Sequence, residues 1–309
     1  MRRKDLLNAL AAAGLLLVTA CSAEASSPGA PDPATSGIRT ELTGAEKDLL
    51  NDAEQRLITD CMRGEGFSYT VDPPPPNRSR APDRPFGLDD VAWARRHGYG
   101  LAADGRSGDR GGAAQTPAGS QERYLASLTP ERRLAFDRAL NGTDREAIVV
   151  EVPGRGQILT SADGCQAEAR SRLYGDLHRW TEAKAIVVNL GYITWDQVVS
   201  EPGYTKALEG WRDCMAARGL PYRSSSEAIG DVASRRPQHT GESARKREMR
   251  TAVADAECNR DAGLSRTGTR LLREHVQAAA RKKFARQARH YTDAVTSALA
   301  RARTVARPE

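Results

Sequence analysis

The amino-acid sequence predicts a mainly α-helical protein made of duplicated, disulfide-linked helical units with long loops and one small β-hairpin. Apolar residues recur at helical spacing in most segments between the loops. The segment DCMRGEGFSY, which begins at Asp60, recurs as DCMAARGLPY from Asp213 with five identical positions. Each copy carries a cysteine, and the chain has four cysteines besides Cys21, an even number that is typical of disulfide pairing. These observations favour an internal duplication of a two-helix unit.

Residues 1–20 have the pattern of a bacterial lipoprotein signal peptide. MRRK is a positively charged start, and LLNALAAAGLLLVTA is an apolar segment too short for a stable membrane span. The end of this segment and the following residue, Val18-Thr19-Ala20-Cys21, match a lipobox, in which small side chains precede a cysteine that becomes a diacylglyceryl thioether. We therefore expect Cys21 to be a lipid-modified N-terminus at the outer face of the cell membrane. An ordinary secretory signal is the alternative, and the sequence leaves open whether export is general secretory or twin-arginine.

The segment after the signal peptide is too polar to form a hydrophobic core. Residues 21–40 are mostly small, polar and rich in proline, and they predict a disordered tether.

In an exported protein, the four remaining cysteines predict two disulfides: Cys61, Cys165, Cys214 and Cys258. Three pairings are possible. The duplication favours unlike partners, and proximity in sequence favours Cys61–Cys165 with Cys214–Cys258 over Cys61–Cys258 with Cys165–Cys214.

The first helical unit is expected over residues 41–190 and begins with a helix. Thr43 is a candidate N-cap, and Glu46 three residues later completes a capping box. Gly66 suits the left-handed position after the helix, and Phe67 can pack back on the last turn as in a Schellman motif. Because Gly219 and Leu220 match them in the second copy, the repeated segment is predicted to be a helix C-terminus.

A large insertion rich in proline and glycine lies between the two cysteines of this first unit. VDPPPPNRSRAPDRPFG is expected to be extended, and LDDVAWARRHGYG predicts a short helix that ends at Gly98. The next stretch, AADGRSGDRGGAAQTPAGS, predicts a long loop. Thr129, Pro130 and Gly142 mark the start and end of another helix. EAIVVEVPGRGQILTS alternates around a Pro-Gly turn and predicts the hairpin, and a long helix is expected from Ser161 to about residue 189.

The second helical unit is expected over residues 191–309. One helix leads to Cys214, RSSSEAIGDVASRRPQHTGES predicts a loop, and a further helix carries Cys258. Residues 265–309 hold eleven basic and three acidic side chains, a net charge of +8 in a chain whose total is +6. Apolar residues spaced by three or four positions predict one long basic C-terminal helix. These are Leu272, Val276, Ala280, Phe284, Ala288, Tyr291, Val295 and Leu299.

Several segments together resemble a group of uncharacterised exported lipoproteins of high-GC Gram-positive bacteria. The lipobox occurs with CMRGEGF, GYGLA, YLASLTPERRLAFDRALNG and GCQAEARSRLYG. The resemblance covers residues 40–180 best and includes the later EGWRDCM. It implies an extracytoplasmic location. It supplies no catalytic residue, because the group has no assigned activity.

The sequence contains no local pattern of a catalytic, metal or cofactor site. No two of its five histidines lie four residues apart, so it lacks a helical metal-binding pair. His178 lies near Asp176, but a hydrogen-bonded surface histidine is the simpler interpretation. Ser243 and Lys246 fit the SxxK pattern of penicillin-recognising enzymes without its companion motifs, as expected by chance. We therefore assign no catalytic residue, no metal ligand and no cofactor.

These observations favour a membrane-anchored, non-enzymatic binding or scaffolding protein of the cell envelope. A cell-wall-active enzyme such as a peptidoglycan hydrolase is the alternative. A solute-binding lipoprotein is disfavoured because such proteins alternate strands and helices. The basic C-terminal helix is a candidate contact for anionic lipid or acidic wall polymers, with a solvated helix face as the alternative, and the compartment excludes nucleic acid. Its basic residues are Arg281, Lys282, Lys283, Arg286 and Arg289.

Overall fold

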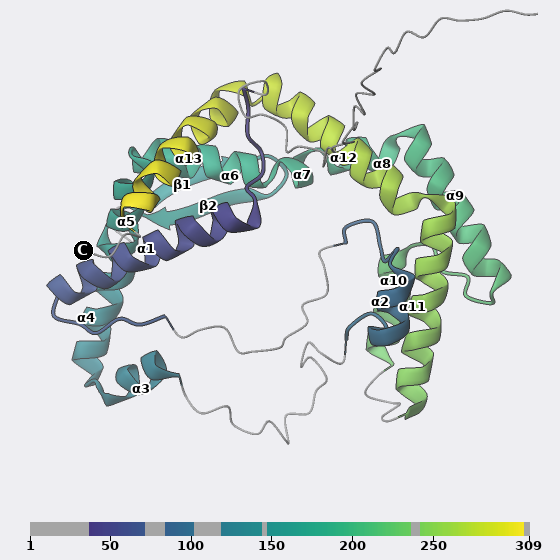
Figure 1. The fold of residues 1–309 in the computed structure, drawn as a ribbon, viewed down its shortest axis with the longest axis horizontal. Coiled ribbons are helices and arrows are strands. Elements are labelled where there is room, and N and C mark those ends of the chain that lie inside the picture. The colour runs from purple at the N-terminus through teal and green to yellow at the C-terminus, as the bar shows by residue number, and fades with distance from the viewer. Residues whose placement is uncertain (1–36, 72–83, 102–118, 144–146, 236–241, 306–309) are drawn as a thin grey trace, which may run out of the picture. The chain divides into compact units, whose positions relative to one another are not determined.

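The computed structural model describes residues 37–71, 84–101, 119–143, 147–235 and 242–305. These residues form thirteen helices and one two-stranded antiparallel sheet, so the predicted mainly α-helical class with one hairpin is confirmed (Figure 1). All of them belong to one compact unit that begins at Gly37. The expected signal peptide, Cys21, most of the tether and the segments 72–83 and 102–118 lie outside the described residues.

The helices are α1 (Gly44–Gly64), α2 (Val91–His97), α3 (Ser120–Ser127), α4 (Pro130–Asn141), α5 (Gly164–Tyr174), α6 (Leu177–Val188), α7 (Leu190–Ile193), α8 (Trp195–Ser200), α9 (Pro202–Ala217), α10 (Ser225–Ser234), α11 (Glu242–Ala262), α12 (Leu264–Arg281) and α13 (Ala285–Val305). The strands are β1 (Ala147–Val152) and β2 (Gly156–Ser161).

The start of α1 has the capping box that the sequence predicts. The Thr43 hydroxyl accepts the backbone N–H of Glu46 at 3.2 Å, and the Glu46 carboxylate accepts the backbone N–H of Thr43 at 2.9 Å. The residues just before this cap are fixed to the body. The backbone N–H of Arg39 donates to the Thr292 hydroxyl at 2.8 Å. Residues 38–40, which the sequence assigns to the tether, therefore contact the helical body.

The repeated segment forms the same helix C-terminus twice, as predicted. Gly66 and Gly219 follow α1 and α9 with φ angles of 76° and 72°, a region that other residues avoid. The next residue, Phe67 or Leu220, donates its backbone N–H to the carbonyl oxygen five residues earlier, at 2.9 Å and 3.0 Å. This is the hydrogen bond of a Schellman motif. The repeat thus encodes a helix stop with an apolar side chain packed over it.

Two disulfides join the helix pairs that the favoured pairing predicts. Cys61 of α1 bonds to Cys165 of α5, and Cys214 of α9 bonds to Cys258 of α11, with a Cα–Cα distance of 5.6 Å in both. The partners of the repeated cysteines differ in their position along the helix. Cys165 lies in the first turn of α5, whereas Cys258 lies near the end of α11. The matched part of each unit is therefore the end of α1 or α9 together with its disulfide.

Two helices that the sequence predicts as continuous are each broken in the structure. The helix expected from Ser161 to about residue 189 divides into α5 and α6, because Gly175 takes a φ of 85° and the Asp176 carboxylate caps α6 through the N–H of Arg179 at 3.0 Å. The long C-terminal helix divides into α12 and α13. There Lys282 leaves the helical region and the N–H of Phe284 donates to the carbonyl of Ala279. Burial of Phe284 in the core accompanies this break.

A further helix replaces part of a predicted loop. α10 forms within the segment that separates Cys214 from α11, so that loop prediction was wrong for residues 225–234. The Ser224 hydroxyl caps it by accepting the N–H of Glu227 at 3.1 Å. Ala228 and Val232, four residues apart, are both buried against the side chains around α2 and α11. Tertiary burial of this short apolar stripe stabilises the helix.

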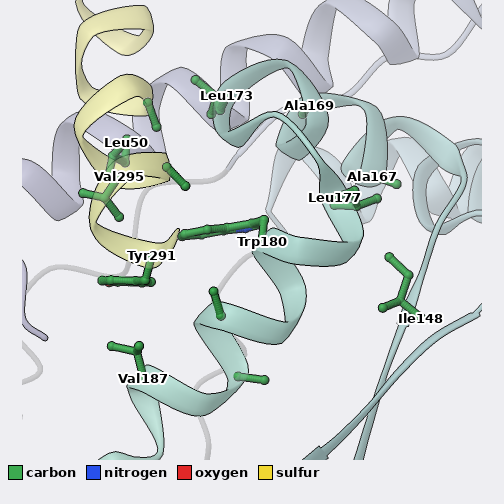
Figure 2. Close-up of a cluster of buried hydrophobic side chains, with 14 of the residues drawn as sticks. Leu50, Ile148, Ala167, Ala169, Leu173, Leu177, Trp180, Val187, Tyr291 and Val295 are labelled. Atoms are coloured by element: carbon green, nitrogen blue, oxygen red, sulfur yellow. The ribbon is translucent and has the colours of Figure 1, made fainter. Parts of the chain in front are cut away.

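The largest hydrophobic core joins α1, α5, α6, α13 and β1 (Figure 2). Trp180 of α6 stacks on Tyr174 at 3.8 Å and on Tyr291 of α13 at 5.5 Å between ring centroids. The hairpin adds Ile148 from the inner face of β1. Trp180 and Tyr291 are buried and Tyr174 is partly buried, and these rings belong to the largest apolar cluster of the described chain.

Helices from each of the two sequence units, residues 41–190 and 191–309, pack against helices of the other unit. α13, from the second sequence unit, packs on α1, α5 and α6 of the first. α2, from the first sequence unit, packs on α11 of the second, where smaller cores surround the Cys214–Cys258 disulfide. The division into residues 41–190 and 191–309 therefore describes the sequence repeat and does not separate two hydrophobic cores.

Candidate functional site

Neither catalytic pattern considered from the sequence is assembled. The Asp176 carboxylate caps α6, and the N–H of Arg179 is the main cause that lowers its pKa below the usual value, so its principal partner is the helix N-terminus, with His178 a smaller influence. Ser243 and Lys246 are both exposed on α11, and the Lys246 ammonium pairs with Glu242 at 2.6 Å. In the part of the chain that the structure describes, no group of three His, Cys, Asp or Glu residues could hold a metal ion.

The predicted basic residues gather at the joint between α12 and α13. All five side chains there are exposed: Arg281, Lys282, Lys283, Arg286 and Arg289. We call this group the basic joint. Within the described chain only Arg286 has an acidic partner, Glu182 of α6, at 3.6 Å. Five positive charges face one carboxylate, so the basic joint carries a strong unbalanced charge.

A groove runs from the basic joint toward the hairpin. Its first part has a volume of about 440 Å³ between α6 and α13. Its second part, about 500 Å³, extends along β1 and includes Phe284. Arg179, Glu182 and Gln287 line both parts, so the two hollows lie side by side. We call them together the basic groove.

The polar side chains of the basic groove are only partly satisfied. The amide of Gln287 donates to the Glu182 carboxylate at 2.9 Å and holds it against α13. His290 lines the same hollow, and its Nε2 atom is buried without a hydrogen-bond partner among the described residues. Arg179 and Arg286 are mostly exposed on its rim. Because Glu151 and Glu182 line the groove together with Arg179 and Arg286, its charges are balanced, and the unbalanced positive charge lies on the basic joint outside it.

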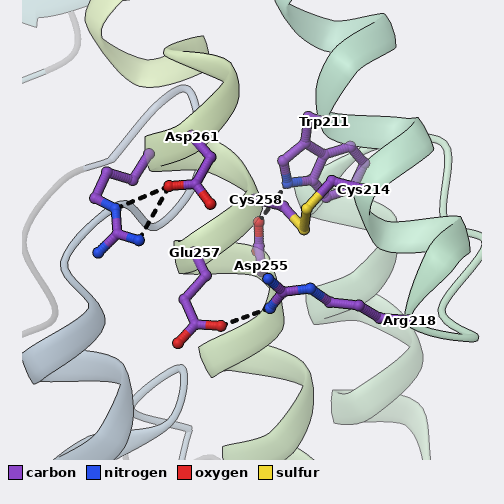
Figure 3. The surroundings of a disulfide bond; sticks show 8 residues. Trp211, Cys214, Arg218, Asp255, Glu257, Cys258 and Asp261 are labelled. Carbon is purple, nitrogen blue, oxygen red and sulfur yellow. Dashed lines mark hydrogen bonds and ion pairs between the residues drawn. A yellow bond between two sulfur atoms is a disulfide. The ribbon is translucent and has the colours of Figure 1, made fainter.

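A second polar cluster, which sequence reasoning missed, is buried around Asp255 of α11 (Figure 3). Its carboxylate accepts hydrogen bonds from the Tyr99 hydroxyl at 3.0 Å, from the Trp211 indole N–H at 2.9 Å and from the Ser225 hydroxyl. Burial raises the pKa of Asp255 against the opposing effect of these donors, and burial next to this carboxylate raises the pKa of Tyr99. All three partners are protein groups, so Asp255 links chain segments and leaves no open position for a substrate.

Two neighbours of Asp255 extend this cluster along one face of α11. The Glu248 carboxylate accepts the backbone N–H groups of Tyr99 and Leu101 at 3.1 Å and 3.2 Å. The Asn259 amide donates to the carbonyl of Phe86 at 2.8 Å. Because these three polar residues are spaced by seven and four positions, they share a helix face. That face holds residues 84–101 of the insertion against α11.

No family model, no curated protein and no solved structure matches the chain. Among the helices that the structure describes, none is long and apolar enough to cross a membrane.

Proposed function

We propose that the protein is a membrane-anchored lipoprotein of the bacterial cell envelope, held through Cys21 at the outer face of the membrane, where it binds or scaffolds without catalysing a reaction. The signal-peptide pattern and the lipobox support the anchor. The unbalanced charge of the basic joint supports a binding role.

The partner proposed for the basic joint is the anionic membrane surface. Two contacts fix the N-terminal end of the body beside it: Arg39 binds Thr292 of α13, and the Gln277 amide of α12 donates to the Thr40 hydroxyl at 3.0 Å. Figure 1 shows this first segment starting near the joint between α12 and α13 and running from there to α1. The chain from Cys21 to Ile38 can span at most roughly 60 Å even when fully extended. A lipid anchor at Cys21 would therefore keep the basic joint within reach of the headgroups, and this favours lipid over wall polymer.

Once the basic joint meets the membrane surface, its charge is enough to add to binding. Near an anionic surface each basic side chain contributes about 1 kcal/mol of attraction, and the effect is screened by salt within a Debye length. Four basic residues of the joint have no acidic partner within the described chain, so no internal ion pair needs to break before they bind. We expect weak, salt-sensitive binding that adds to the lipid anchor.

Vesicle binding with charge-matched variants tests this proposal. The mature chain with Cys21→Ser is mixed with phosphatidylglycerol-containing vesicles or neutral phosphatidylcholine vesicles. We expect it to bind the anionic vesicles and to dissociate as salt is raised. A variant with Arg281, Lys282, Lys283 and Arg289 changed to Gln should lose at least tenfold in affinity. The control changes Lys47, Arg56, Arg138 and Arg245, four exposed residues elsewhere, and has the same net charge.

The outcomes separate the possible partners. Equal binding to both kinds of vesicle, or equal loss in the control, would overturn the proposed role of the basic joint. Binding to purified acidic wall polymer but not to anionic vesicles would assign the surface to the wall. Digestion of purified cell wall by the same protein would instead support the alternative, a cell-wall-active enzyme.

A further inference from the structure

A third hollow lies beside the Cys214–Cys258 disulfide, away from the basic joint. It has a volume of about 460 Å³ and is lined by Arg95, Arg218, Leu220, Met249, Arg250, Val253 and Ala254. We call it the arginine pocket. Three chain segments build it: α2, the C-terminal end of α9, and α11. The disulfide joins two of these segments, and the buried contacts of α11 with residues 84–101 hold the third. The pocket is therefore held together by both covalent and buried polar contacts.

The charges of the arginine pocket are unbalanced. The Arg95 and Arg218 guanidinium groups both donate to the Glu257 carboxylate, at 3.1 Å and 2.6 Å (Figure 3 shows the Arg218 contact). The hydrogen bond from Arg218 is the main cause of the lowered pKa of Glu257, which keeps that carboxylate ionised. Arg250 has no hydrogen bond or ion pair with any residue that the structure describes. Arg95 and Arg218 share the Glu257 carboxylate and Arg250 is unpaired within the described chain, so three guanidinium groups and one carboxylate leave a net charge of about +2.

Glu257 also positions the arginines. Each guanidinium has five N–H donors in a planar fork, so one contact to Glu257 leaves donors for a second anion. Arg95 and Arg218 are held at opposite oxygens of the same carboxylate. This reduces the loss of side-chain freedom when a ligand binds. The arrangement suits a phosphate or carboxylate group, which guanidinium binds through two parallel hydrogen bonds.

The remaining wall of the pocket is apolar. Met249, Val253 and Ala254 contribute from one side of α11, and Leu220 contributes from the Schellman motif after α9. An inorganic ion would leave these side chains in water. A ligand with a negative head and a short apolar part would contact the guanidinium groups with its head and cover these apolar side chains with its other end.

We propose that the arginine pocket binds a small amphiphilic anion, with a phosphate or carboxylate head on Arg95, Arg218 and Arg250 and an alkyl part on Met249 and Val253. Its volume falls within the ordinary range of small-molecule sites. The site is separate from the basic joint. It is built to recognise one ligand molecule, whereas the joint faces an extended surface.

Calorimetric titration of the mature chain carrying Cys21→Ser tests this inference, since that chain has no lipid of its own to compete. The probe is octyl phosphate below its micelle concentration. Inorganic phosphate, octanol and octyltrimethylammonium are the comparison ligands. We expect octyl phosphate to bind at least tenfold more tightly than any of these, and phosphatidylglycerol vesicles to leave its affinity unchanged. Competition by the vesicles would mean that the natural source of the anion is a bilayer lipid.

Two variants locate the site. Arg250→Gln should weaken octyl phosphate at least tenfold without a change in melting temperature, because Arg250 makes no contact that holds the fold. The matched control is Arg245→Gln on an exposed turn of the same helix, and it should bind normally. Equal affinity of Arg250→Gln and the control would overturn the proposal, as would equal affinity for inorganic phosphate or for the cationic amphiphile. The variant of the basic joint should bind octyl phosphate normally, so this proposal can fail while the membrane proposal stands.

Discussion

Trp211 donates its indole N–H to the Asp255 carboxylate at 2.9 Å, and both side chains are completely buried. Each of the two residues stands three positions before a cysteine of the same disulfide, Cys214–Cys258. The covalent bond and the buried hydrogen bond therefore lie one helical turn apart on the same helix pair.

Removal of Asp255 should destabilise the fold more than removal of any of its partners. Asp255→Ala leaves three buried donors unsatisfied, and we expect a loss of about 3–5 kcal/mol in the free energy of unfolding. Trp211→Phe removes a single donor and keeps an aromatic ring, so it should cost about 1–3 kcal/mol. Urea denaturation with the disulfides intact measures both. A loss below about 1 kcal/mol for Asp255→Ala would contradict the assigned role of this carboxylate.

The raised pKa of Asp255 predicts a pH dependence of stability. In the folded protein Asp255 keeps its proton at a higher pH than in the unfolded chain, where its pKa is near the ordinary value of 3.8. Between the two pKa values the folded state binds more protons, so this group's contribution to stability falls as pH rises. The free-energy difference between wild type and Asp255→Asn should therefore be most favourable to the wild type below pH 3.8 and should shrink above it. If the stability advantage of the wild type grew with pH, the hydrogen bonds to Asp255, and not its burial, would dominate its pKa.

Both disulfides should contribute substantially and unequally to stability. They close separations of 104 residues for Cys61–Cys165 and 44 residues for Cys214–Cys258. Chain entropy then predicts stabilisation of about 5 and about 4 kcal/mol, respectively. Serine replacement of each pair, followed by denaturation, measures the two losses. Non-reducing peptide mapping checks the pairing itself, and a peptide that joins Cys61 to Cys214 would contradict it.

Gly268 of α12 allows a close approach that no larger residue permits. A Cβ atom at this position would lie 2.5 Å from the Phe86 ring, which in turn stacks on Trp195 at 5.0 Å. Gly268→Ala should therefore cost about 1–3 kcal/mol through overpacking. Gly230 of α10 provides the matched control, because its Cβ would meet nothing within 4 Å. Gly230→Ala should stabilise by about 0.5–1 kcal/mol, and similar effects of the two changes would contradict the packing described for Phe86.

Local signals in the sequence account for what could be predicted. The capping box at Thr43, the glycine stops at Gly66 and Gly219, and the hairpin around Pro153 each depend on a few neighbouring residues. The repeated segment and proximity in sequence together favoured the disulfide pairing, which the structure then decided. α10 also had a local signal, a serine cap with a glutamate three residues later, which the abundance of serine and glycine around it obscured.

The rest depends on tertiary packing, which leaves no local signal. The break before Phe284 occurs without glycine or proline, because the aromatic side chain enters the core there. Asp255 lies in a stretch of alanines and charged residues, and a charged residue in a helix is usually exposed. Arg95 and Arg250 are 155 positions apart in the sequence, and only the packing of α2 on α11 brings them to one pocket. No spacing rule relates such residues.

Mass spectrometry of the protein purified from membranes tests the central claim most directly, because the proposed location and the basic joint's partner both depend on the anchor at Cys21. We expect a mature N-terminus at Cys21 that carries a diacylglyceryl thioether, and we expect Cys21→Ser to release the protein or leave an uncleaved precursor. An unmodified N-terminus at any other residue would contradict the anchor and with it the proposed location at the membrane surface.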